Sequence, residues 1–118
     1  MNIEELRMYC MAKKGVTEEL PFDDITLVYK VMGKIFALTN TIGEVSINLK
    51  CDPELAIELR EQYSSVLPGY HMNKKHWNTI IVDDSIPAQV ILEWIDRSYN
   101  LVVNSLPNKI KHTLNSLS

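Results

Sequence analysis

The sequence predicts an α+β domain in which helices cover one face of a single antiparallel sheet. Residues with strand preference cluster in two regions, 26–51 and 76–82, whereas helical periodicity is confined to separate segments before, between and after them. Glycine-containing links join neighbouring strand segments, as in hairpins. Clustered strands with separate helices favour two layers, so we expect the order α-βββ-α-ββ-α.

Size and composition are those of one ordinary domain. The chain has 118 residues, of which 46% are hydrophobic and 23% charged, enough to form one core without disulfide or metal support. We expect a single domain over residues 1–107, followed by a polar C-terminal tail, 108–118. Cys10 and Cys51 form no C-x-x-C pair, which favours two free thiols and a reducing compartment.

The N-terminal segment has the signals of a helix start. Asn2 and Glu5 have the spacing of a capping box, and apolar residues recur at helical spacing until Gly15, which predicts a helix over about 3–14. Residues 18–24 contain Pro21 and follow neither period, so we expect a loop there.

The central strands are predicted from alternation and turn residues. Residues 26–32 and 35–39 read as a hairpin linked by Gly33-Lys34. Residues 45–51 alternate, with Val45, Ile47, Leu49 and Cys51 on one face.

The second half begins with a helix. Asp52 as cap and Pro53 at the first helical position predict a helix to about residue 64. Two short strands, about 69–73 and 76–82, and a long helix, about 86–105, are expected next. In the tail, apolar residues at helical spacing indicate a frayed or partner-dependent helix: Ile110, Leu114 and Leu117.

Charge and hydropathy restrict the classes of function. A net charge of -3 disfavours a surface wholly devoted to phosphates, so any contact with nucleic acid must be local. The start of the chain is acidic and lacks the basic and apolar regions of a signal peptide, and no stretch has the roughly 18 apolar residues of a membrane span. We therefore expect a cytoplasmic protein without membrane contact.

Residues 68–82 combine aromatic, basic and amide side chains most densely. Lys74-Lys75 reads as an exposed tip, and strand alternation separates His76 and Asn78, predicted outward, from Trp77 and Ile81, predicted inward. Two interpretations remain open. The segment is either a surface that contacts phosphates and bases, or a hairpin turn with solvated lysines and a packed tryptophan.

Metal, cofactor and catalytic sites are not predicted. His71 and His76 lie five residues apart across an expected turn and lack accompanying ligands, so we assign no metal. The pairs Glu18-Glu19 and Asp23-Asp24 read as a solvated acidic loop. Neither a nucleophile motif nor a phosphate-binding glycine loop is present, so we expect no cofactor and no enzyme.

Several sequence blocks resemble the MmcQ/YjbR family of small bacterial proteins. The resemblance extends over about residues 1–111 and departs from the family at Asp84, where a glycine is expected before the last long helix. The blocks are Leu20-Pro21-Phe22, residues 28–38, Leu49-Lys50-Cys51-Asp52-Pro53, residues 68–79, and residues 98–102 ahead of Leu106-Pro107.

This resemblance implies a fold related to secretion chaperones and to the frataxin-like CyaY proteins, with a "double-wing" surface for double-stranded DNA. We expect DNA to contact the open sheet face and hairpin tips through Lys30, Lys34, Asn73, Lys74, Lys75, His76 and Asn78. The alternative is a non-enzymatic, chaperone-like interaction module that binds a peptide or forms a homodimer through the same face or the tail.

Overall fold

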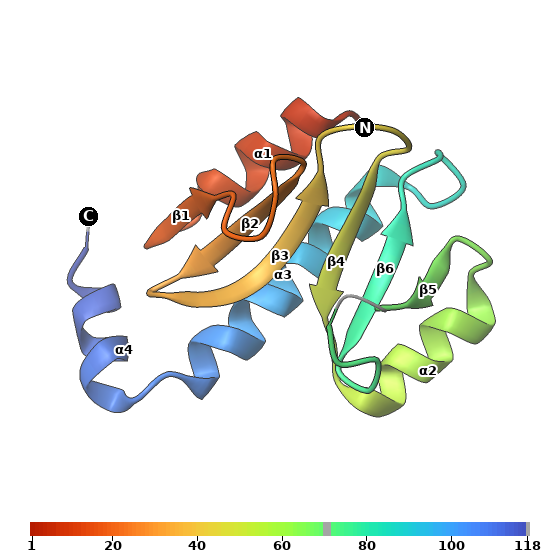
Figure 1. Cartoon of the computed structure of the whole chain (residues 1–118). Coiled ribbons are helices and arrows are strands. Elements are labelled where there is room, and N and C mark those ends of the chain that lie inside the picture. The colour runs from red at the N-terminus through yellow and green to blue at the C-terminus, as the bar shows by residue number, and fades with distance from the viewer. Residues whose placement is uncertain (70–71, 118) are drawn as a thin grey trace.

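A computed structural model describes residues 1–69 and 72–117 of the chain. Six antiparallel strands form one sheet in the order β1-β2-β3-β4-β6-β5, with the helices on one of its faces (Figure 1). This confirms the predicted α+β class. The strands are β1 (Val16–Glu19), β2 (Thr26–Val31), β3 (Lys34–Asn40), β4 (Ser46–Lys50), β5 (Val66–Pro68) and β6 (Trp77–Ile81). The helices are α1 (Ile3–Met11), α2 (Pro53–Gln62), α3 (Ala88–Ser105) and α4 (Asn108–Asn115).

The main core lies between α3 and the middle of the sheet. α3 crosses behind β3 and β4, and its apolar stripe buries Ile91, Ile95 and Val102 against the strands (Figure 1). Tyr29 and Phe36 are fully buried on the strand side. Because this face is closed by helices, any surface for a partner on the sheet must use the other face.

Local signals account for most element boundaries. The capping box of α1 is present, with the Glu5 amide donating to Asn2 Oδ1 at 2.9 Å. The β2–β3 turn is Met32-Gly33 rather than the predicted Gly33-Lys34, and both residues have positive φ, 50° and 85°. Asp84 also has positive φ, 69°, a conformation that suits the glycine expected there from the resemblance and that aspartate tolerates better than most residues.

The structure corrects the expected loop at residues 18–24. Val16–Glu19 form the edge strand β1, in which Glu18 pairs with Tyr29. Arg7 of α1 binds the Glu18 carboxylate through two hydrogen bonds, 2.9 and 2.8 Å, so a tertiary contact fixes an acidic residue in a strand.

The strand predicted at 69–73 is also corrected. The strand β5 ends at Pro68, and residues 72–76 form a bend and turn before β6; Tyr70 and His71 lie outside the described residues. A Cβ on Gly69 would lie 2.8 Å from the Cβ of Trp77 and 2.9 Å from its carbonyl oxygen, so the close approach of the two segments requires glycine.

The tail segment packs on the domain. Residues 108–115 form α4, whose Leu114 is 3% exposed and belongs to the main core, with Ile110 packed beside it. Leu117 remains exposed.

Candidate binding surface on the helix-free face

The face of the sheet opposite the helices carries a second, smaller apolar cluster. Val28, Leu38 and Trp77 are buried there, and Ile35 and Met72 pack against them. Cross-strand pairs place Asn48 beside Thr79 and Lys50 beside Trp77 on the same face. This helix-free face is therefore apolar at its centre and polar around it.

The predicted orientation of β6 is wrong. Asn78 pairs with Leu49 and Ile80 with Ile47, so both point toward the helices, and Trp77 and Ile81 point to the helix-free face. Asn78 is only 2% exposed, and its Nδ2 donates to the carbonyl oxygen of Ala56 at 3.2 Å. Its side chain therefore contacts α2 rather than solvent.

The turn before β6 is held by a hydrogen bond within the turn and by contacts from α2 and the end of β4. Asn73 Oδ1 accepts a hydrogen bond from the Lys75 amide at 2.8 Å, and Arg60 of α2 donates to the Lys74 carbonyl oxygen at 3.0 Å. His76 is half-buried, and its carbonyl oxygen accepts from the Cys51 amide at 2.7 Å. These contacts leave the side chains of Lys74 and Lys75 exposed at the tip.

The two predicted lysines of the β2–β3 hairpin differ in environment. Lys30 Nζ lies 2.9 Å from Glu19 Oε2 across the first two strands, and its side chain is partly covered. Lys34 is exposed next to the turn. Of these two, Lys34 is better placed to contact an external ligand.

Antiparallel pairing groups lysines at one end of the sheet. Lys34 starts β3, Lys50 ends β4, and Lys74 and Lys75 precede β6, so these four lysines lie at one end, which we call the cationic end. The exposed acidic residues Asp52 and Glu54, at the start of α2, follow Lys50 at this end. The acidic end, opposite, is defined by Asp23, Asp24, Glu44, Asp83 and Asp84.

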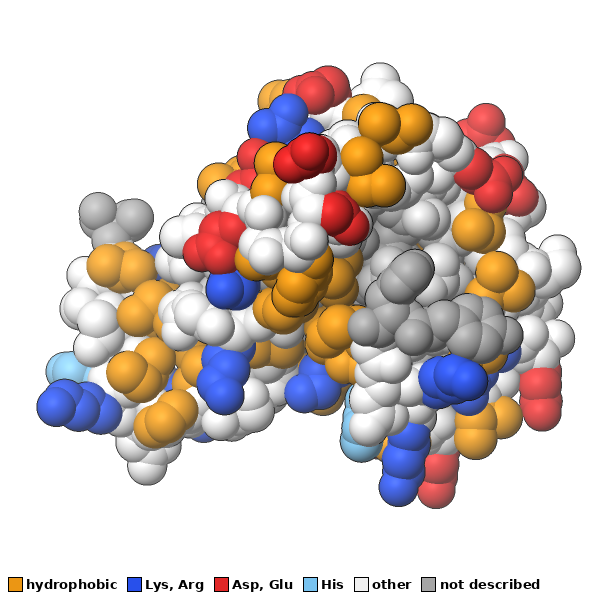
Figure 2. All heavy atoms as spheres, in the orientation of Figure 1, with side chains coloured by type: hydrophobic (Ala, Val, Ile, Leu, Met, Phe, Trp, Pro, Cys, Tyr) orange, Lys and Arg blue, Asp and Glu red, His pale blue; other side chains and the backbone are white. Residues whose placement is uncertain are grey.

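Figure 2 shows this distribution. Acidic side chains are frequent along the upper rim of the helix-free face, with a basic side chain among them at upper left, and basic side chains cross its lower part, with acidic ones at lower right (Figure 2). Lys50 was not among the predicted contacts; the alternating pattern of its strand and the direction of that strand could have identified it.

A pocket of about 250 Å³ lies at the acidic end. Phe22 and Asp23 of the β1–β2 loop line it together with Thr26, Leu38 and Asn48 of the sheet. Asn48 Oδ1 accepts a hydrogen bond from the Thr79 hydroxyl at 2.5 Å, which fixes the carboxamide of this lining residue. We call this the Phe22 pocket.

The described residues contain no group of three or more His, Cys, Asp or Glu side chains placed to hold a metal ion. Cys10 and Cys51 are free and buried. Burial raises the pKa of Cys10 to about 12 and also raises that of Cys51, so both thiols are protonated at neutral pH. Of the helices in residues 1–69 and 72–117, none combines the length and apolar character needed to cross a bilayer.

Comparison with known proteins identifies the family. The sequence model of the family described as YjbR matches residues 11–101. The chain belongs to the YjbR family. The protein YjbR of Escherichia coli K12, itself described as uncharacterized, is 39% identical over 115 residues, which cover 97% of this chain and 98% of that protein. The uncharacterized YbdF of E. coli O157:H7 is 38% identical over 104 residues, 81% of this chain and 85% of that protein.

Solved structures support the same YjbR-family fold. The crystal structure of Deinococcus radiodurans protein DR2400, described as a DUF419 domain, matches with a TM-score of 0.90 and 38% identity over 97% of this chain and 88% of that one. A Pseudomonas syringae protein matches with a TM-score of 0.75 and 28% identity, over 86% of this chain and 98% of that one.

Proposed function

We propose that this YjbR-family protein is a non-enzymatic DNA-binding protein that contacts the phosphate backbone of double-stranded DNA through the cationic end of its sheet. The observation that carries the proposal is the gathering of Lys34, Lys50, Lys74 and Lys75 from three separate segments at that end. Cations grouped on one side supply local phosphate affinity even where the net charge is negative.

Two exposed tips frame this end. Lys34 adjoins the β2–β3 turn, and Lys74 and Lys75 occupy the turn before β6, with Lys50 between them in the sheet. Projecting turns on either side of a central lysine suit contacts to phosphates on both sides of a groove, in keeping with the double-wing surface that the family resemblance implies. Since phosphate contacts position a protein without reading bases, we expect weak sequence preference.

Salt titration with a labelled 24-base-pair duplex tests the proposal by fluorescence anisotropy. If about three or four phosphates are neutralised, log K should fall with log[salt] with a slope of about -3 to -4. The double variant K34E/K75E should bind more weakly and lower the magnitude of this slope by about 2, because each lysine accounts for about one phosphate contact.

The control is Q62E/Q89E, which also makes the net charge more negative, at two exposed helical positions away from the cationic end. This control should retain affinity and slope within error. Absence of binding at about 20 mM salt, or equal losses in both double variants, would refute a contact surface at the cationic end.

A second candidate function is an interaction module that binds a protein partner. Three large apolar side chains are exposed within the short β1–β2 loop, Leu20, Phe22 and Ile25. Grouped exposed apolar residues are typical of interaction sites, whereas single ones are common on any surface. The apolar side chains of the tail favour this candidate less, because Leu114 is already used in the core.

Homodimerisation is the form of this candidate that light scattering tests directly. The molar mass across about a hundredfold range of concentration should rise if copies associate through the loop, and F22S should then restore the monomer. A constant monomeric mass excludes the homodimer and leaves a different protein as the partner to be tested.

A further inference from the structure

We infer that the Phe22 pocket binds a basic side chain, arginine or lysine, from an extended segment of a partner protein. This inference deepens the second candidate function and does not depend on DNA binding, since the pocket lies at the opposite end of the sheet from the cationic end. The shape of the pocket, the exposure of Phe22 and the charge around the opening all favour such a ligand.

The shape fits one side chain. The pocket volume of about 250 Å³ is smaller than typical small-molecule sites, which measure about 300–1,000 Å³. It is enough for one long side chain. Leu38 and Phe22 supply apolar surface for an aliphatic stem, and Thr26 and Asn48 are polar residues of the lining.

The aromatic ring at the rim favours a cation. Phe22 is 64% exposed, so its ring keeps free surface beside the opening of the pocket. Aromatic faces attract guanidinium and ammonium groups that lie within about 6 Å of the ring centroid. Arginine also stacks its planar group on such rings, which lysine does not do.

Charge at the acidic end selects the same class of ligand. Asp23 is one of the residues that line the pocket, while Asp24 and Glu44 lie at the same end of the sheet. Asp23 is held in place because Oδ1 accepts from the amides of Ile25 and Thr26, at 2.9 and 2.7 Å, and Oδ2 accepts from the Thr26 hydroxyl at 3.1 Å. A carboxylate fixed in this way is prepared for a cation and would repel an acidic side chain.

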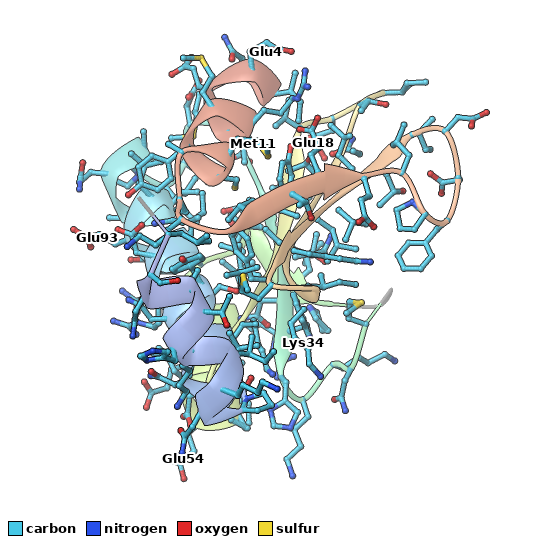
Figure 3. All side chains as sticks on the ribbon, turned by 90° about the vertical axis from the view of Figure 1, so that its left-hand side faces the viewer. Glu4, Met11, Glu18, Lys34, Glu54 and Glu93 are labelled. Atoms are coloured by element: carbon cyan, nitrogen blue, oxygen red, sulfur yellow. The ribbon has the colours of Figure 1, made fainter. Side chains whose placement is uncertain are left out.

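The loop position suits an extended partner segment. The side view shows the β1–β2 loop projecting from the sheet on the side away from the helices (Figure 3). Leu20 and Ile25 flank Phe22 on that loop and are exposed. A basic residue flanked by apolar residues would therefore place its charge in the pocket and its neighbours on the loop.

The test is an NMR titration of the full chain, labelled with ¹⁵N, with the blocked peptide acetyl-Gly-Leu-Arg-Leu-Gly-amide. We expect saturable shifts of the Asn48 side-chain amide and the Thr26 backbone amide. The same peptide with citrulline, which keeps shape and loses charge, should bind about fivefold more weakly or worse. The glutamate peptide should give no saturable shifts at these amides.

Variants assign the contact. F22A should remove most of the affinity, and D23N should reduce the preference for arginine over citrulline while its amide oxygen still accepts the loop hydrogen bonds. I57A is the control, since Ile57 is an exposed apolar residue of α2 outside the pocket lining, and it should leave affinity unchanged.

Three results would overturn the inference: no saturable shifts, shifts remote from the pocket, or equal affinity for arginine and citrulline peptides. Equal affinity with loss in F22A would reject the basic ligand and still support an apolar interaction module, so the two proposals fail separately. A second copy of this chain as the partner is recognised by light scattering.

Discussion

The hydroxyl of Ser98 on α3 bridges two strands at the point where their pairing ends. Ser98 Oγ donates to the Phe36 carbonyl oxygen at 2.6 Å and accepts from the Lys50 amide at 2.8 Å. The last cross-strand pair between β3 and β4 is Ala37 with Leu49, so Ser98 links the next two residues along. The register of β2 with β3 also shifts at this level, between Tyr29 and Lys30.

Ser98→Ala should therefore destabilise the fold strongly for a change of one oxygen atom. The buried Phe36 carbonyl and Lys50 amide would each lose a partner, which costs about 2–4 kcal/mol in total. Urea unfolding followed by circular dichroism measures the change. The control Ser105→Ala removes a similar bond to the Val102 carbonyl near the surface and should cost under about 1 kcal/mol. Equal losses in the two variants would contradict the bridging role of Ser98.

The ion pair between Glu18 and Arg7 should give stability that depends on pH. Hydrogen bonds from Arg7 lower the pKa of Glu18, so its contribution is complete above the unfolded pKa of about 4.3 and is lost as pH falls through the lower folded value. The difference in unfolding free energy between the wild type and Glu18→Gln should therefore be constant from pH 7 to about 5 and shrink below about 4.

Urea titrations at four pH values measure this difference. Glu58→Gln, at an exposed position of α2, is the control and should change stability by under about 0.5 kcal/mol at pH 7. A wild-type advantage over Glu18→Gln that persists unchanged at pH 3 would show that the carboxylate charge is not its source.

Gly15 and Leu114 join the N-terminal and C-terminal parts of the chain. A Cβ on Gly15 would lie 2.5 Å from Leu114 Cδ1, and Gly15 has φ of +74°. Gly15→Ala should cost about 2–4 kcal/mol from strain and overlap together. Gly43→Ala is the control for strain alone, since its φ is +84° and no atom lies within 4 Å of the added Cβ, so about 1–2 kcal/mol is expected.

A double-variant cycle separates the overlap. Leu114→Ala alone should cost about 2–4 kcal/mol, and in that background Gly15→Ala should cost no more than Gly43→Ala does. Strict additivity would mean that α4 does not pack on Gly15 as the structure describes.

Local signals in the sequence predicted most of the fold, because caps, turn glycines and periodicity act between near neighbours. The edge strand β1 was missed because Glu18 is kept in it by Arg7, a contact between distant residues. The cationic end follows from strand order, which a single segment does not contain. Likewise, the Phe22 pocket joins a loop to strands that are distant in the sequence.

The sequence-based prediction assigned the two faces of β6 the wrong way round, and the reason can be identified. Alternation correctly separated Trp77 from Asn78, but both faces of the sheet bury apolar side chains, so hydrophobicity did not indicate which face the helices cover. Trp77 joins the smaller cluster, and Asn78 takes the place on the helix side that an apolar residue was expected to fill.

A substitution at Asn78 can therefore test whether water reaches the space beneath α2. Among described protein groups, none donates to its buried Oδ1, and it lines a cavity of about 10 Å³ together with Leu55, Leu59 and Trp94. Asn78→Asp would place a carboxyl there, and burial should raise its folded pKa above the unfolded value of about 3.9. Below that pH the variant should be nearly as stable as the wild type, and its stability should fall progressively as pH rises toward the raised folded value.

Urea unfolding at pH 3.5, 5 and 7 measures this trend, with Asp24→Asn, at an exposed loop position, as the control that should show no such fall. A pH-independent loss in Asn78→Asp would mean that water reaches the carboxyl and that α2 does not seal the space.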